Sequence, residues 1–151
     1  GVIKVGLISN LSEGMISLTK PSAENMFVTA ITTLWFSAVS SAIVDNIPFV
    51  ASMIPLVIDT AHAVLPSGTD FKSVVQHPTL MPVWWSLALG ACLGGNGSPV
   101  GASANVITLG LAEKAGYPIS FKKFIIYAIP ITIETIIIAT VYIWLRYYIF
   151  L

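Results

Sequence analysis

One segment, GACLGGNGSPVGASANV at residues 90–106, constrains the fold more than any other part of the sequence. It places glycine, proline and polar residues in the middle of an apolar stretch, 81–112, that is long enough to cross a membrane. Helices disfavour Gly and Pro in their interior, and lipid penalises backbone groups that lack hydrogen-bond partners. We therefore predict a discontinuous transmembrane helix over 81–112, whose unwound middle is enclosed by protein or lines a watery cavity.

The composition indicates an all-α integral membrane protein that crosses the bilayer several times. Of the 151 residues, 56% are hydrophobic and only 9% are charged, whereas soluble domains carry about 25% charged residues. The formal net charge is zero, so nothing indicates a nucleic-acid partner. Because the sequence has no nucleophile–base pair and no metal-ligand spacing, we expect neither an enzyme nor a bound cofactor or metal, apart from sodium.

A second apolar segment, 25–65, is interrupted by Asp45-Asn46-Ile47-Pro48. Two full spans would fit, since each needs about 20 apolar residues. The alternative is a re-entrant hairpin, in which two helical arms meet inside the membrane and return to the same side. The turn is short and carries no Lys or Arg. Both arrangements leave the two ends of the segment on one side of the bilayer.

Two further elements complete the predicted fold. Residues 1–20 fit an interfacial helix that lies along the membrane, because Gly and polar residues interrupt their apolar pattern. Residues 124–150 fit a terminal transmembrane helix with an aromatic belt near its end. Polar loops at 66–78 and 113–123 join the apolar segments.

The distribution of lysines predicts the orientation in the membrane. Loop 113–123 carries three lysines, whereas loop 66–78 carries only Lys72. Cytoplasmic loops are enriched in Lys and Arg, so we expect loop 113–123 to be cytoplasmic. The 25–65 segment then opens to the outside, and the C-terminus lies on the outer side.

The interruption within 81–112 supplies candidate ligands. Gly94, Gly95 and Gly97 would let the backbone adopt conformations closed to other residues. Freed backbone groups at such breaks hold ions and substrates in transporters. Neutral oxygens and amide donors would come from four polar side chains, namely Asn96, Ser98, Ser103 and Asn105. Oxygen ligands suit a hard cation such as sodium.

Two acidic residues lie in apolar surroundings. Asp45 is a functional candidate, because an acidic residue inside a membrane usually has a role in transport. An ion at the turn would meet free carbonyl groups at the end of the first arm. It would also meet free N–H groups at the start of the second arm, near Asn46 and Pro48. Glu134 lies in the middle of the terminal span. Either acid could carry protons during transport. Glu134 could instead pair with a polar group elsewhere in a longer protein, or lie near an interface.

Each interruption also has a purely structural interpretation. Small residues at Ala91, Gly94 and Gly101 would allow helices to pack closely, although this does not explain the polar side chains between them. Asp45 would then be a helix N-cap or part of an exposed turn between two ordinary spans.

Together, SAIVDNIPFVASMIPLV and GACLGGNGSPVGASANVITLGLAEKAGYPISF resemble the ion transporter superfamily. The resemblance is greatest to the branch that contains P protein, D-type sodium/proton antiporters, arsenical pumps and citrate transporter-like proteins. It covers nearly the whole chain, and the pair of motifs is more specific than either motif alone.

The resemblance implies two inverted repeats, each with a re-entrant hairpin and a broken helix. The ion and substrate site would form where hairpin tip and helix break meet, which assigns Asp45–Pro48 and Gly94–Asn105 to the site. Relatives usually form homodimers, so we expect a homodimer here as well. We expect residues 1–151 to be the C-terminal repeat of a transporter whose N-terminal repeat lies outside this chain.

The sequence therefore predicts part of a secondary active transporter, either a sodium/proton antiporter or a cation-coupled transporter of a small anion. A channel-like anion pathway on the same fold is one alternative, and a membrane scaffold subunit without transport is another. The channel would conduct anions without a counter-ion gradient. The scaffold subunit would keep its function after the substitutions Asn46→Ala and Asn96→Ala.

Overall fold

The computed structural model describes residues 14, 17, 19–21, 26–66 and 70–150. These residues form helices and contain no β-strand. In chain order the α-helices are α2 (Phe27–Ser41), α3 (Asn46–Val64), α4 (Phe71–Gln76), α5 (Met81–Gly94), α6 (Ser103–Lys114) and α7 (Phe121–Trp144). Three short helical turns are η2 (Pro78–Leu80) before α5, η3 (Gly95–Gly97) after it, and the π-helical η4 (Leu145–Ile149), which extends α7.

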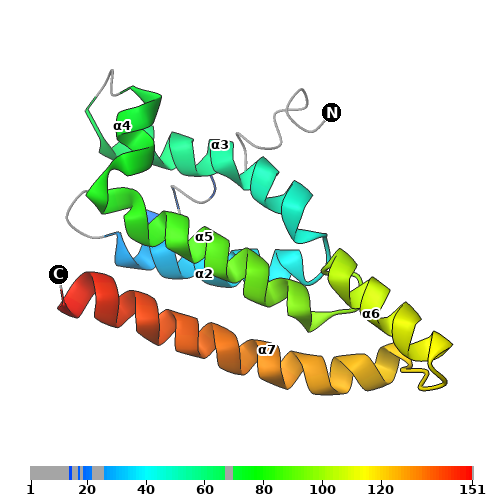
Figure 1. Cartoon of the computed structure of the whole chain (residues 1–151). Helices are drawn as coiled ribbons and strands as arrows, with labels where there is room; N and C mark the ends of the chain where they lie inside the picture. Colours follow the sequence, from blue (N-terminus) through cyan, green and yellow to red (C-terminus); the bar gives the residue numbers. More distant parts are fainter. Residues whose placement is uncertain (1–13, 15–16, 18, 22–25, 67–69, 151) are drawn as a thin grey trace.

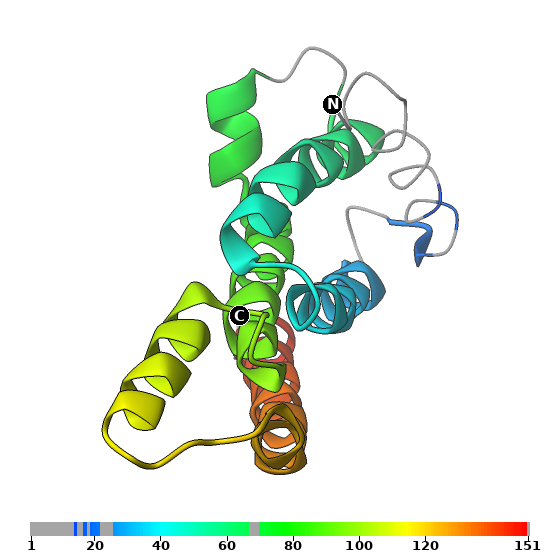
Figure 2. The same ribbon diagram turned by 90° about the vertical axis from the view of Figure 1, so that its right-hand side faces the viewer.

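Helix α5 is the centre of the arrangement, since it packs against α2, α3 and α7. In Figures 1 and 2, α2, α5 and α7 lie side by side, and α3 crosses α5 on the side away from α7. Figure 1 shows that α2 and α5 run in the same direction and that α7 runs back. Helix α6 projects from this group and has no buried residue.

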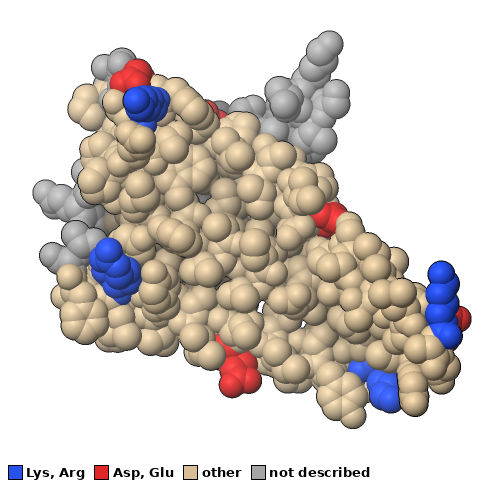
Figure 3. Space-filling view, in the orientation of Figure 1, with Lys and Arg blue, Asp and Glu red and all other residues tan. Residues whose placement is uncertain are grey.

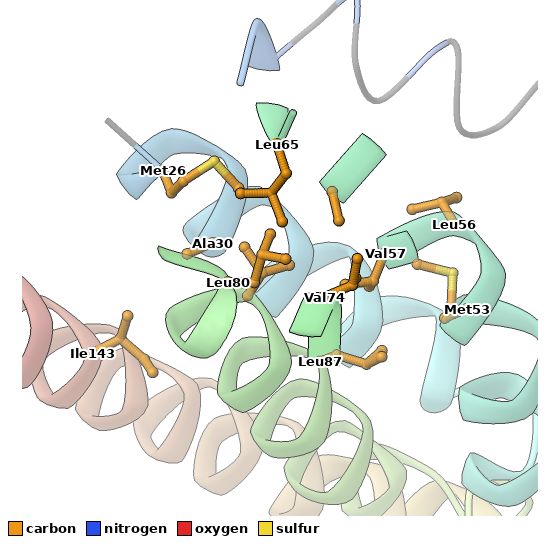
Figure 4. Close-up of a cluster of buried hydrophobic side chains, with 12 residues drawn as sticks. Met26, Ala30, Met53, Leu56, Val57, Leu65, Val74, Leu80, Leu87 and Ile143 are labelled. Carbon is orange, nitrogen blue, oxygen red and sulfur yellow. The ribbon is translucent and has the colours of Figure 1, made fainter. Parts of the chain in front are cut away.

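The larger core cluster lies between α2, α3, α4 and α5 at the end away from α6, with Ile143 of α7 at its margin, as Figure 4 shows. Leu56, Leu80 and Ile143 are among its fully buried members. A smaller cluster joins α2 to α7 through Leu34 and Ile136. The two clusters supply the apolar contacts between the helices, and hydrogen bonds from Ser41 to the Ala91 carbonyl oxygen and from Trp35 to the Thr140 hydroxyl add polar ones.

Most of the outer surface is also apolar. Figure 3 shows one face on which charged side chains are few and widely separated. Two helical segments are long and apolar enough to span a membrane, Asn46–Val64 with 19 residues and Phe121–Ile149 with 29 residues. Only 11% of the apolar window in the second segment is buried inside the structure. Such a surface requires lipid or further protein around it.

The structure confirms the all-helical prediction and differs from it at two boundaries. Residues 66–78, expected to be a polar loop, contain α4, because Asp70 caps its first turn by accepting a hydrogen bond from the Ser73 N–H at 3.3 Å. Helix α7 begins at Phe121 rather than at residue 124, because Ser120 caps it. The interfacial helix predicted at 1–20 lies almost entirely outside the described residues.

Candidate functional site

The turn between α2 and α3 lies against the interruption between α5 and α6. The Ser98 hydroxyl donates to the Ala42 carbonyl oxygen at 2.5 Å, and the Ser41 hydroxyl donates to the Ala91 carbonyl oxygen at 2.7 Å. Both bonds join segments at least 50 residues apart in the sequence. The two interrupted segments of the sequence therefore meet at one junction.

Asp45 lies at this junction and links two helices. Its Oδ1 accepts a hydrogen bond from the Ile47 N–H at 3.2 Å, which caps α3. Its Oδ2 accepts one from the Ser103 hydroxyl at 2.5 Å, and Ser103 is the first residue of α6. Helix N-termini carry partial positive charge, so a carboxylate between two of them is electrostatically favoured. The N-cap interpretation of Asp45 is thus confirmed, and its link to Ser103 adds a second contact.

Asn105 organises the interruption from the other side. Its Nδ2 donates to the Gly95 carbonyl oxygen at 3.0 Å and to the Ser98 carbonyl oxygen at 2.9 Å. The Gly101 N–H donates to the Ser98 hydroxyl at 3.0 Å. Side chains therefore take the place of the helical hydrogen bonds that the break removes, as buried backbone groups require.

The prediction about glycine conformation is wrong. Gly94 has φ −61° and Gly95 has φ −56°, which are ordinary helical values. Among the described glycines only Gly116 has a positive φ. These positions need glycine for a different reason: a Cβ on Gly94 would clash with the backbone of Ala38, and one on Gly101 would lie 2.8 Å from the Ser41 carbonyl oxygen.

Close packing through small residues is therefore the better account of the glycines. Gly90 and Gly94 bring α5 against α2, where a Cβ on Gly90 would lie 2.8 Å from the Ser37 Cβ. A Cβ on Gly97 would stand 3.3 Å from the Ala42 Cβ and 3.7 Å from the Thr132 side chain of α7. The glycines let three helices converge at the junction, and the polar side chains can then reach across it.

The remaining candidates lie around the junction with fewer contacts. Asn46 and Pro48 are in the first turn of α3, where proline is tolerated because the N–H groups have no helical partners. Asn96 is exposed and lines a cavity of about 390 Å³ that also has Lys123 in its wall. Among the described residues, no hydrogen bond holds the side chain of Asn46 or Asn96.

Glu134 is not part of the junction. It is exposed on α7 and borders a surface hollow lined by Pro130 and aliphatic side chains of the same helix. The carboxylate thus faces lipid or further protein, and the structure does not bring it to Asp45. No group of three or more His, Cys, Asp or Glu side chains that could hold a metal ion occurs among the described residues.

The sequence analysis missed Thr132. Its hydroxyl is buried, has no hydrogen-bond partner among the described residues, and lies where α7 contacts Gly97. The available signal was a polar residue within the aliphatic segment IPITIETIII, but a lone threonine in a long span is more often a packing residue than a ligand.

A helical pair and an interrupted helix that meet at a polar junction, inside an apolar surface, form an arrangement typical of membrane transport proteins. The family model for citrate transporters matches residues 1–90, and the chain belongs to this family, within the ion transporter superfamily. It is an integral membrane protein of a transporter family and not an enzyme.

Several curated proteins are similar to the chain. An uncharacterized transporter of Mycobacterium bovis is 41% identical over 99% of this chain and 32% of its own length. A 46 kDa membrane protein of Mycobacterium leprae is 40% identical over 97% of this chain. The human P protein is 36% identical over 90% of this chain and 15% of its own length. The chain thus spans about a third of the mycobacterial relatives, and no solved structure matches it.

Proposed function

We propose that this chain forms half of the ion site of a secondary active transporter that exchanges sodium for protons. The observation that carries the proposal is the position of Asp45, between the first turns of α3 and α6 at the junction. A carboxylate offers about four acceptor positions, and the Ile47 N–H and the Ser103 hydroxyl occupy two of them among the described residues. One carboxylate that binds either a sodium ion or a proton, but not both, would couple the movements of the two cations.

The depth of the junction in the membrane supports this proposal. Gly97 approaches Thr132, which is near the middle of the 29-residue span Phe121–Ile149. Helix α2 has only 15 residues, or about 22 Å at 1.5 Å per residue, and is too short for a hydrocarbon core of about 30 Å. The shortness of α2 favours a re-entrant hairpin with its tip, at Ala42–Asp45, inside the bilayer, whereas α3 with 19 residues is long enough to span it.

The rest of the site would come from outside this chain. The first partner would be an N-terminal repeat of the same transporter. Two observations support this partner: the chain exposes a large apolar surface, and it covers only 32% of its mycobacterial relative. The complete assembly would be a homodimer. Loop 113–123 would be cytoplasmic and the C-terminus would lie on the outer side, because the lysines gather in that loop.

A second candidate function is cation-coupled transport of a carboxylate, and the citrate transporter family supports it. The N-termini of α3 and α6 would favour an anion at the junction. Asp45 already occupies that position, however, and would repel a substrate carboxylate unless a cation lay between them. We therefore place sodium/proton exchange first.

The test uses the complete protein that contains this chain, reconstituted in liposomes, with an imposed sodium gradient and a pH-sensitive dye inside. Wild-type protein should move protons when sodium is present, and Asp45→Asn should abolish the movement. Asp59→Asn is the matched control, since Asp59 is an exposed carboxylate on the same helix. Its rate should equal that of the wild type.

Each alternative gives a different result in the same liposomes. Citrate uptake without proton movement under the sodium gradient would favour the carboxylate transporter. Anion currents that need no counter-ion gradient would indicate a channel. A folded protein that moves no solute would indicate a scaffold subunit.

A further inference from the structure

We infer that a cavity along the first half of α7 binds one anionic phospholipid, with the lipid phosphate at Lys123 and an acyl chain inside the cavity. The inference rests on the orientation proposed for loop 113–123 and does not depend on which ions the protein moves. This Lys123 cavity has a volume of about 390 Å³. Protein pockets that hold small molecules have about 300–1,000 Å³, so the space is sufficient for part of a lipid.

The lining of the Lys123 cavity is mostly apolar. One face of α7 forms the larger part of it, since positions 123, 124, 127, 128, 131 and 132 follow the three- and four-residue spacing of a helix face. Ile119 and Asn96 complete the wall from the preceding loop and from η3. Phe124, Ala128 and Ile131 offer only carbon atoms, which suit a hydrocarbon chain and would leave a polar ligand without partners.

The position of the cavity along α7 matches the depth of a phospholipid in the bilayer. The segment Phe121–Ile149 has 29 residues, or about 43 Å at 1.5 Å per residue, whereas the hydrocarbon core is about 30 Å thick. Lys123 is near the beginning of this segment, and lysines near helix ends extend to the membrane interface. Ile131 lies about 12 Å deeper, at 1.5 Å per residue. The Lys123 cavity thus runs from the headgroup region into the hydrocarbon.

Basic side chains gather at the same end of the molecule. Loop 113–123 contains Lys114, Lys122 and Lys123, and Glu113 is its single acid. In Figure 3, blue side chains lie at the end where α6 and the beginning of α7 are found in Figure 1. Among the described residues, no carboxylate forms an ion pair with Lys122 or Lys123. Because anionic lipids of the cytoplasmic leaflet attract basic segments, a lipid phosphate would supply the counter-charge.

The other hollows beside α7 lack this combination of a cation and an apolar wall. The cavity of about 350 Å³ beside Trp35 and Ile43 has no charged side chain in its lining. The hollow beside Glu134 has an acid in its lining and no base. Neither offers a cation to a phosphate, so the lipid belongs at the Lys123 cavity.

The experiment measures the melting temperature of the complete protein in detergent as dioleoyl phosphatidylglycerol or dioleoyl phosphatidylcholine is added. The two lipids have the same acyl chains and differ in net charge. Phosphatidylglycerol should raise the melting temperature of the wild type at about tenfold lower concentration, since a bond between charged groups is worth roughly a factor of ten. Inorganic phosphate should not raise it, because it lacks the acyl chain.

Separate variants test the two parts of the site, each compared with its own lipid-free melting temperature. Lys123→Gln should remove most of the preference for phosphatidylglycerol, and Lys123→Arg should keep it. Ala128→Phe should fill the cavity and weaken the effect of both lipids, because Ala128 is part of its wall. Lys72→Gln is the matched control, since Lys72 is an exposed lysine in the other polar loop. It should respond as the wild type does.

Several outcomes would overturn the inference. A preference for phosphatidylglycerol that survives Lys123→Gln unchanged would exclude the phosphate from Lys123. Equal responses of the wild type to the two lipids, or an equal response to inorganic phosphate, would exclude an anionic phospholipid. If Ala128→Phe responds as the wild type does, another part of the complete protein covers the cavity. None of these results involves ion movement, so the liposome assay judges sodium/proton exchange separately.

Discussion

Ser103 donates a hydrogen bond to Asp45 at 2.5 Å and thereby joins the first residue of α6 to the residue that caps α3. The bond crosses 58 residues of sequence. Together with the bond from Ser98 to the Ala42 carbonyl oxygen, it fixes the turn of one apolar segment against the break of another. The two segments therefore depend on each other for their geometry.

The contact between α5 and α2 leads to the first prediction. Gly94→Ala should destabilise the protein by about 1–3 kcal/mol or more, because its Cβ would overlap the backbone of Ala38, which cannot move aside as a side chain can. Gly110→Ala on α6 is the control. No atom lies within 4 Å of its Cβ position, and alanine is the better helix former, so stability should hold or rise. Thermal unfolding in detergent measures both. Equal effects of the two substitutions would contradict the packing account.

Asn105 gives a second prediction. Asn105→Asp keeps the shape of the side chain but loses the donor that serves the Gly95 and Ser98 carbonyl oxygens. It also places a carboxylate beside two acceptors. We expect a loss of about 1–3 kcal/mol in unfolding free energy, as for other buried groups left without partners. Urea unfolding at neutral pH measures the change.

The same substitution has an internal control. Protonation of the introduced carboxyl restores a donor, so the deficit of Asn105→Asp should shrink at acidic pH. A deficit that does not depend on pH would contradict the assigned hydrogen bonds.

How much of this arrangement the sequence predicts depends on the distance over which each interaction acts. The break after Gly94 and the turn at Asp45 follow from local rules, since Gly, Pro and capping residues act within a few positions. The role of the glycines does not follow locally. Gly94 has helical dihedral angles, and only the approach of Ala38 explains it.

Thr132 was missed for the same reason. It packs against Gly97, and nothing in the aliphatic segment around it indicates that neighbour. Helix α4 is the opposite case. The spacing of Asp70 and Ser73 is a local capping signal, but it lies within a polar stretch that the sequence predicts to be a loop.

Asp70 provides a prediction about pH outside the membrane. Hydrogen bonds from the Ser73 hydroxyl and N–H hold the pKa of Asp70 below its ordinary value of 3.8. A carboxyl with a lowered pKa stabilises the folded state above its unfolded pKa, and this contribution is lost as the pH falls through the folded pKa. The cap on α4 should therefore persist at pH 7 and weaken below about pH 4.

Hydrogen exchange of the amides in Phe71–Gln76 measures this effect, after correction for the intrinsic exchange rate. Asp70→Ala should reduce protection at pH 7 and remove the dependence on acid. Ser73→Ala should do so in part, since it keeps the bond from the Ser73 N–H. If the wild type and Asp70→Ala respond to acid alike, another group controls the helix.

The most direct test of the central claim is a double-mutant cycle on Asp45 and Ser103, measured as sodium-driven proton movement in liposomes at saturating and at limiting sodium. The cycle needs variants that still transport, and Asp45→Asn should not. The pair is therefore Asp45→Glu, which keeps a carboxylate, and Ser103→Ala. If turn and break form one ion site, each single variant should raise the sodium concentration needed for half-maximal rate by about tenfold. The double variant should need little more sodium than either single variant, because the two substitutions disrupt the same contact. If the two effects simply multiply, Asp45 and Ser103 act independently, and turn and break do not form one ion site.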